Sequence, residues 1–133
     1  MDTDAFRELG ASSFPGYLGI DVTLVESGRA EGRLELEPHH LAPNGFLHAG
    51  VVTGLADTAC GYGCIASLPA GATGFTTVEL KANFLGTALE GAITVEATLL
   101  HGGRTTQVWD ATVRAGGRTI ALFRCTQLVL YPR

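Results

Sequence analysis

The chain has 133 residues, of which 46% are hydrophobic and 17% are charged, and its formal net charge is −4. This composition excludes a disordered chain, and the length indicates a single domain over residues 1–133. The chain is acidic overall and lacks the basic stripe with interleaved aromatic residues that is typical of a nucleic-acid-binding surface. We therefore expect no nucleic-acid partner.

The three cysteines, Cys60, Cys64 and Cys125, cannot all pair within one chain, and the N-terminal residues lack the basic region of a signal peptide. We therefore expect reduced thiols and a cytoplasmic protein. The longest apolar stretch, residues 51–68, carries Asp57 and three glycines. These residues argue against a membrane span, so no membrane partner is expected.

The first third of the chain predicts a helix and a hairpin. Residues 4–11 have the pattern of a short amphipathic helix, which a breaker cluster at residues 12–16 ends. Residues 18–26 predict a strand, and residues 30–37 alternate apolar and polar side chains, as does a strand with one wet face. The turn at residues 27–29 joins the two strands into a hairpin.

One long helix is predicted after a loop at residues 38–47. Residues 51–68 are apolar on nearly every face and rich in Gly and Ala, which lets neighbouring elements pack closely, and a Pro-Ala-Gly sequence ends the helix. Four strands in a meander follow, predicted at residues 75–85, 92–100, 105–115 and 119–131. Tandem glycines at residues 102–103 and 116–117 predict tight turns because glycine supplies the positive φ that those turns require.

A helix that is apolar on every face must be surrounded by other elements. The element order therefore predicts an α+β fold in which a curved antiparallel sheet wraps around one long central helix. Because one sheet cannot enclose a helix completely, we expect part of this helix to meet a second copy of the chain.

Asp57 is the only charged residue in the predicted long helix. It is either a structural carboxylate that caps a helix or pairs with another group inside the fold, or a general base or nucleophile with a pKa shifted by burial. The free N–H groups at the start of the helix, around Ala49 and Gly50, are suited to a developing oxyanion. The alternative for them is an ordinary junction between a loop and a helix.

The spacing of these two features bears on the number of chains in the site. Ala49 and Asp57 are eight residues apart, which is about 12 Å along a helix. A reacting carbonyl needs its oxyanion donor and its nucleophile or base within roughly 3 Å. If both are catalytic, the start of the helix in one subunit must meet Asp57 of another, which predicts a two-fold symmetric dimer with two equivalent sites.

The histidines and cysteines give no sign of a metal site. His48 either polarises a carbonyl or is a loop histidine whose hydrogen bonds are satisfied locally. His39 and His40 lack Cys or carboxylate partners at ligand spacing, so we predict that they are surface residues. We expect Cys60 and Cys64 to fill the core, since two thiols do not make a zinc site.

The segment Asn44 to Gly61 carries the sequence Asn-Gly-Phe-Leu-His-Ala-Gly, followed by Leu-Ala-Asp at residues 55–57. It resembles the His-Gly-Gly/Ala-Gly plus Leu-Ala-Asp signature of hotdog-fold acyl-CoA thioesterases of the PaaI-like group, and residues 75–85 resemble the strand after the helix in that group. The resemblance implies hydrolysis of an acyl-CoA thioester by a homodimer or a dimer of dimers, with the site at the subunit interface. It implies no separate cofactor, because coenzyme A is part of the substrate.

The resemblance also implies roles for single residues. Asp57 matches the carboxylate that attacks the thioester or activates water, and the N–H of Ala49 matches the oxyanion donor. His48 matches the histidine that helps to fix the loop and the thioester oxygen. Thr77 falls where a Ser or Thr often positions the water.

One position departs from the pattern of the group, which often has Asn or Gln six residues before the histidine. This chain has Ala42 there, while Asn44 stands four residues before His48. Either Asn44 takes that role through a different path of the loop, or the contact is missing.

Coenzyme A brings phosphates, so basic residues should rim the site. The candidates are Lys81, Arg104, Arg118 and Arg133, which the sequence does not rank, and a solvated surface charge is the alternative for each. Gly50 would allow a ligand to approach the backbone closely.

Two other functions remain open. A protein that keeps the fold but only binds acyl-CoA or another small ligand is compatible with Ala42. A hotdog enoyl-CoA hydratase is the other, although the chain has neither a Gly-Asp-x-Asn-Pro-x-His run nor a histidine fourteen residues from the helix carboxylate. Aryl and aliphatic acyl groups are both open as substrates, as are the nucleophile and general-base roles of Asp57.

Overall fold

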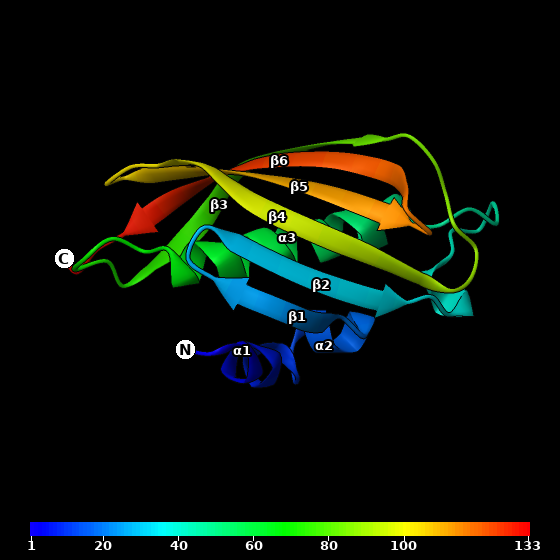
Figure 1. Cartoon of the computed structure of the whole chain (residues 1–133), viewed down its shortest axis with the longest axis horizontal. Coiled ribbons are helices and arrows are strands. Elements are labelled where there is room, and N and C mark those ends of the chain that lie inside the picture. The colour runs from blue at the N-terminus through cyan, green and yellow to red at the C-terminus, as the bar shows by residue number, and fades with distance from the viewer.

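The computed structural model describes all 133 residues. A curved sheet packs around one long helix (Figure 1). The helices are α1 (Thr3–Gly10), α2 (Phe14–Leu18) and α3 (Ala49–Ala66). The strands are β1 (Asp21–Glu26), β2 (Arg29–Glu35), β3 (Gly74–Phe84), β4 (Ala92–Gly102), β5 (Thr106–Ala115) and β6 (Arg118–Leu130), and a 3₁₀ turn lies at Pro38–His40. The predicted α+β architecture, an antiparallel sheet around a central helix, is confirmed.

The order of strands in the sheet is β1-β2-β4-β5-β6-β3. The prediction of a four-strand meander is therefore wrong for β3, which pairs with β6 from Gly74↔Leu130 to Phe84↔Ala121 and lies at the far edge. Residues 85–91 carry the chain from that edge across the end of the sheet to β4 (Figure 1). A local pattern identifies a strand but not its partner, because a connection of this length allows several pairings.

Helix α2 corrects a second prediction, because the sequence predicts a breaker cluster at residues 12–16 and a strand from residue 18. Pro15 lies in the first turn of the helix, where its missing N–H costs no hydrogen bond. Gly19 ends the helix in the left-handed conformation, with φ 88°. Strand β1 consequently begins at Asp21 and not at Leu18.

The two tandem-glycine turns differ from each other. Gly116 and Gly117 have positive φ, as predicted. Gly102 and Gly103 do not, because β4 continues to Gly102 through a bulge, and the turn is closed by the Gly103 N–H donating to the Thr106 carbonyl over 2.9 Å.

The glycines of α3 let large side chains reach the helix backbone, as predicted. A methyl group at Gly63 would come within 2.5 Å of the buried Trp109 ring, and one at Gly61 within 3.1 Å of the Phe75 ring. All three cysteines are buried free thiols in the same core. None of the helices combines the length and the apolar character needed to cross a membrane.

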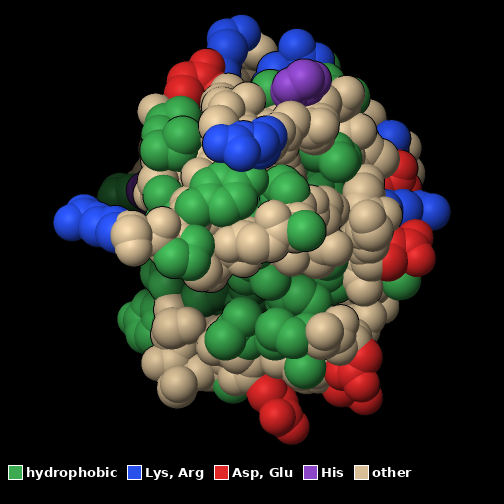
Figure 2. Space-filling view, turned by 90° about the vertical axis from the view of Figure 1, so that its left-hand side faces the viewer, with side chains coloured by type: hydrophobic (Ala, Val, Ile, Leu, Met, Phe, Trp, Pro, Cys, Tyr) green, Lys and Arg blue, Asp and Glu red, His purple; other side chains and the backbone are tan.

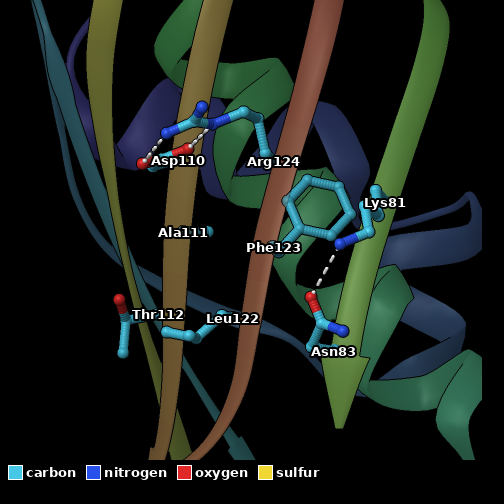
Figure 3. A pocket seen from close by; sticks show the side chains of 8 residues that line it. All are labelled: Lys81, Asn83, Asp110, Ala111, Thr112, Leu122, Phe123 and Arg124. Atoms are coloured by element: carbon cyan, nitrogen blue, oxygen red, sulfur yellow. Dashed lines mark hydrogen bonds and ion pairs between the residues drawn. The ribbon is translucent and has the colours of Figure 1, made fainter.

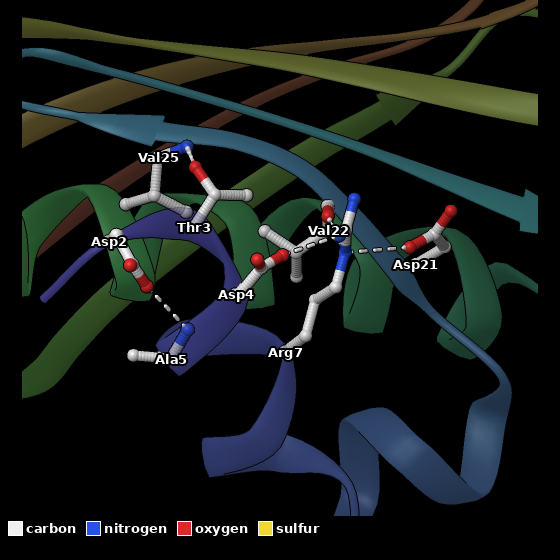
Figure 4. Close-up of polar contacts among 8 residues, drawn as sticks. All are labelled: Asp2, Thr3, Asp4, Ala5, Arg7, Asp21, Val22 and Val25. Carbon is white, nitrogen blue, oxygen red and sulfur yellow. Dashed lines mark hydrogen bonds and ion pairs between the residues drawn. The ribbon is translucent and has the colours of Figure 1, made fainter.

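The edge of the sheet at β1 is covered by α1 (Figure 4). Thr3 Oγ1 accepts the Val25 N–H over 3.2 Å, and Arg7 Nε donates to the Val22 carbonyl over 2.7 Å. Arg7 also forms ion pairs with Asp4 and Asp21. Backbone groups that would otherwise face solvent at this edge are thus bonded to side chains of the same chain.

Candidate active site

Helix α3 begins at a loop whose backbone N–H groups are nearly all used within the chain. His48 is the N-cap: its Nδ1 accepts the Gly50 N–H over 2.8 Å, and its carbonyl accepts the Val51 N–H over 3.0 Å. The Leu47 N–H donates to Thr87 Oγ1 over 3.0 Å, and the His48 N–H donates to the His40 carbonyl over 3.0 Å. These bonds fix the path of the loop into the helix.

Ala49 is the first residue of α3, and its N–H has no acceptor among the hydrogen bonds of this junction. The residue is also exposed. Of the two N–H groups predicted as oxyanion donors, the Gly50 N–H is already bonded to His48. The Ala49 N–H is therefore the remaining candidate.

His40 is not a surface residue, and that prediction is wrong: only 1% of it is exposed. Its Nδ1 accepts the Glu37 N–H over 3.0 Å, and its Nε2 lies 2.7 Å from the Leu18 carbonyl. A ring that accepts at Nδ1 carries its proton on Nε2, so the imidazole is neutral and donates to Leu18. His40 thereby ties the loop to α2, while its neighbour His39 is exposed as predicted.

Asp57 lies in the middle of α3 and is half-buried. Its Oδ1 is shielded from solvent and has no hydrogen-bond partner in the chain. Burial raises the pKa of this carboxyl above its ordinary value. Asp57 thus neither caps a helix nor pairs with a cation inside the protomer.

Thr77 lies on β3, on the side of the strand that meets α3. Two positions before it, Phe75 packs against Gly61, which is one helical turn beyond Asp57. The Thr77 hydroxyl donates to Gln127 Oε1 over 2.6 Å. The start of β3 and the middle of α3 thus form one part of the candidate site.

An apolar hollow of about 430 Å³ borders Ala49 at the other part of the site. It lies between the start of α3 and the end of β3, and two phenylalanines in its lining are largely exposed in the single chain. The lining residues are Phe46, Leu47, Ala49, Val52, Phe84, Leu85, Gly86 and Thr87. Sequence reasoning missed this hollow because its two walls are far apart in the chain.

Asn44 turns the loop rather than entering this hollow. Its Oδ1 accepts the Phe46 N–H over 3.2 Å, and the residue is exposed. Ala42 is bonded only through its backbone, to Phe46 and Gly45. The side-chain amide nitrogen of Asn44 has no partner in the protomer.

The basic candidates lie in different places. Lys81 is on the outer face of the sheet with Arg124, and its Nζ donates to Asn83 Oδ1 over 3.1 Å (Figure 3). The Arg104 guanidinium lies over the Tyr131 ring at the end of the molecule opposite the start of α3, an end where hydrophobic side chains are exposed among polar and charged ones (Figure 2). Within one protomer neither residue is brought to Ala49.

Arg118 is the basic residue that reaches the lining of the hollow. Its guanidinium donates to the Thr87 carbonyl over 3.1 Å, and Thr87 in turn holds the Leu47 N–H. Among the predicted cations, the geometry therefore favours Arg118 as the one beside the site.

The candidate residues thus form two separate groups in one chain: His48, Ala49 and the hollow at the start of α3, and Asp57 with Thr77 farther along. Two residues that sequence reasoning missed support these groups, His40 under the loop and Gln127 behind Thr77. The sequence does carry a sign of Gln127: it is an amide at an inward-facing position of β6, where the neighbouring inward positions hold Ala, Phe, Cys and Val.

Residues 44–122 match the family described as the Thioesterase superfamily. The matched span contains His48, Ala49, Asp57 and Thr77. It also contains both walls of the hollow and most of the sheet.

The chain is 33% identical over 110 residues to a 1,4-dihydroxy-2-naphthoyl-CoA hydrolase from Listeria monocytogenes, covering 82% of this chain and 89% of that protein. It is 34% identical over 109 residues to the acyl-coenzyme A thioesterase PaaI from Escherichia coli, covering 80% and 75%. A thioesterase structure from Haemophilus influenzae matches it with a TM-score of 0.91 at 25% identity, over 98% of this chain and 92% of that one. The predicted resemblance is confirmed: the chain belongs to the Thioesterase superfamily, has the hotdog fold and is a thioester hydrolase of that family.

Proposed function

We propose that this enzyme hydrolyses acyl-CoA thioesters at a site shared by two subunits. The observation that carries the proposal is the pair of unsatisfied groups in the protomer, the Ala49 N–H and Asp57 Oδ1. This donor and this acceptor lack hydrogen-bond partners and lie about 12 Å apart along one helix. They can act on a single carbonyl only when a second chain brings them together. The acyl-CoA substrate is supported by the two relatives whose names specify CoA thioesters.

The open edge of β3 supports the dimer. Val78, Leu80 and Phe84 on this strand are 57%, 43% and 47% exposed. A long apolar edge strand invites pairing with another chain, and here no element of the same chain covers it. If two β3 strands pair antiparallel about a two-fold axis, the start of one strand, beside Asp57 and Thr77, lies towards the end of the other, beside Ala49.

In the proposed mechanism the thioester carbonyl oxygen accepts the Ala49 N–H of one subunit. Asp57 of the other subunit takes a proton from water, and the water oxygen adds to the carbonyl carbon. The tetrahedral intermediate collapses, the C–S bond breaks, and the leaving thiolate of coenzyme A takes from Asp57 the proton that came from water. The products are a carboxylic acid and the free thiol of coenzyme A.

The hollow beside Ala49 supplies apolar contacts for the part of the substrate next to the carbonyl. Arg118 is placed to contribute positive charge at its rim. A nucleophilic role for Asp57 is the alternative within this mechanism. Hydrolysis in H₂¹⁸O over many turnovers separates the two, since only the nucleophilic route places ¹⁸O in the Asp57 carboxylate.

The proposal is tested first with Asp57→Asn, which is expected to fold and associate normally but to lose about 10²–10⁴-fold in kcat. The assay follows release of free thiol from aryl, short-chain and long-chain acyl-CoA. Turnover at the wild-type rate in this variant would exclude Asp57 as base or nucleophile. Tight binding without thiol release by the wild type would point to a binding protein, and loss of enoyl-CoA absorbance to a hydratase.

Ala49→Pro tests the oxyanion donor. Proline lacks the N–H but suits the first position of a helix, and the extended backbone of His48 before it (φ −65°, ψ 128°) is compatible with a following proline. We expect kcat to fall about 10²–10³-fold. Ala49→Gly, which keeps the N–H, is the matched control and should retain activity.

A mixture of the two inactive variants tests the shared site. When Asp57→Asn and Ala49→Pro chains are refolded together, half of the dimers are mixed and each mixed dimer has one intact site, so about a quarter of the wild-type activity should return. Absence of recovery, with mixed dimers confirmed by mass spectrometry, would place both groups in a site made by one chain.

A further inference from the structure

Gln127 is a fully buried amide whose two ends are both engaged. Its Oε1 accepts the Thr77 hydroxyl over 2.6 Å, and its Nε2 donates to Cys125 Sγ over 3.5 Å. The other buried glutamine, Gln107, bonds the Trp109 indole and the Ser67 carbonyl, both parts of the core. Gln127 differs because one of its partners is a half-buried hydroxyl in the candidate site.

The direction of the bond between Thr77 and Gln127 determines what Thr77 offers to the site. A hydroxyl has one proton and two lone pairs. Because the proton of Thr77 is given to Gln127, its oxygen can only accept any further hydrogen bond. A threonine without this partner would be free to rotate and to donate to the carboxylate of Asp57 instead.

Cys125 helps to fix the orientation of the amide. Its Sγ accepts the Gln127 Nε2–H over 3.5 Å. With the nitrogen end turned to sulfur, the oxygen end of Gln127 is the one that faces Thr77. The Thr77 hydroxyl of β3 is thus held by a side chain of β6 whose own orientation is fixed.

We infer that Gln127 is a positioning residue for the hydrolytic water, acting through Thr77; this rests on the function proposed above. Water has two protons, and the site presents two acceptors, the carboxylate of Asp57 and the oxygen of Thr77. A water molecule that donates one proton to each points a lone pair away from both, towards the carbonyl carbon. Gln127 prevents Thr77 from becoming a competing donor.

The test is a double-mutant cycle with Gln127→Met and Thr77→Val. Methionine fills a similar volume without a polar atom, so Gln127→Met should lower kcat about five- to tenfold, as expected for one lost hydrogen bond, with KM unchanged. In the Thr77→Val background the same change should have no further effect on kcat. Thr77→Ser, which keeps the hydroxyl, should retain the dependence on Gln127.

Gln107→Met is the matched control, since it removes a buried amide away from Thr77. We expect it to lower the unfolding midpoint while the folded enzyme keeps its kcat. Gln127→Asn provides a second variant if Gln127→Met does not fold, because the shorter amide stays polar but cannot span the distance to Thr77.

The inference is overturned if Gln127→Met and Gln127→Asn keep the wild-type kcat, or if the loss is undiminished in the Thr77→Val background. Failure of the proposed function has a different signature: the wild type would release no thiol, or Asp57→Asn would be as active as the wild type.

Discussion

Strands β1 and β3 lie at opposite edges of the same sheet and are treated differently by the chain. Strand β1 has six residues, and α1 bonds to its free backbone groups through Thr3 and Arg7. Strand β3 has eleven residues, carries exposed apolar side chains and has no cover. One edge is closed within the protomer, and the other is the open edge at which we propose that a second chain pairs.

The charged side chains near the two edges also differ. Beside β1, Arg7 is paired with Asp4 and Asp21. On the side of α3 that meets the start of β3, Asp57 has no partner and a raised pKa. An uncompensated carboxylate with a shifted pKa is typical of functional sites, which agrees with the site that we propose beside the open edge.

The largest effect is expected from a charge on the open edge. Leu80→Asp should separate the dimer and lower activity by about two orders of magnitude or more, because the two halves of each site part and the oxyanion donor is lost. Light scattering and thiol release measure the two outcomes. Thr23→Asp, on the exposed face of β1, is the control and should change neither. A monomeric Leu80→Asp enzyme with full activity would show that the edge at β3 does not contribute to the site.

The pH dependence of activity should report on the charge of Asp57. In the proposed mechanism the carboxylate is the active form, and burial raises its pKa. As pH falls through this raised pKa, kcat/KM should drop about tenfold per pH unit, and the drop should begin at a higher pH than an ordinary aspartate gives. A profile that stays flat down to the ordinary range would show that the dimer stabilises the charged carboxylate.

The charged form of Asp57 that activity requires should lower the free energy of unfolding. Because the folded-state pKa is raised, the folded chain holds this proton more tightly than the unfolded chain does. Stability from this group is therefore greatest below the unfolded pKa and falls as pH rises to the folded pKa. At neutral pH we expect Asp57→Asn to be more stable by about 0.5–2 kcal/mol in urea unfolding, with the gain vanishing at low pH.

The smallest effect is expected at the closed edge. Thr3→Val removes the acceptor for the Val25 N–H and should cost about 0.5–1.5 kcal/mol of unfolding free energy. Dimer mass and kcat should stay unchanged, as measured on the same samples. A loss of activity here would show that the two edges are coupled.

Much of this arrangement could be predicted from the sequence. The apolar pattern of α3 and the alternation in β2 and β5 are local signals, and each identified its element. Asp57 and Ala49 were identifiable because a lone carboxylate and a helix start are also local features. The resemblance in residues 44–61 supplied the family.

The rest depends on contacts between distant residues, which local patterns do not encode. The place of β3 beside β6, the burial of His40 and the hollow beside Ala49 each need the folded sheet. Two adjacent histidines flanked by prolines have the composition of a surface loop, and only the Leu18 carbonyl shows that one of them belongs inside.

The bonds that shape the site also span long stretches of sequence: 22 residues from Leu18 to His40, 40 from Leu47 to Thr87, and 50 from Thr77 to Gln127. Each of these bonds closes a long loop, whose entropy is lost only when the whole sheet is formed around α3. The path of the chain into Ala49 and the orientation of the Thr77 hydroxyl are therefore set by distant residues and not by the local helix or hairpin alone.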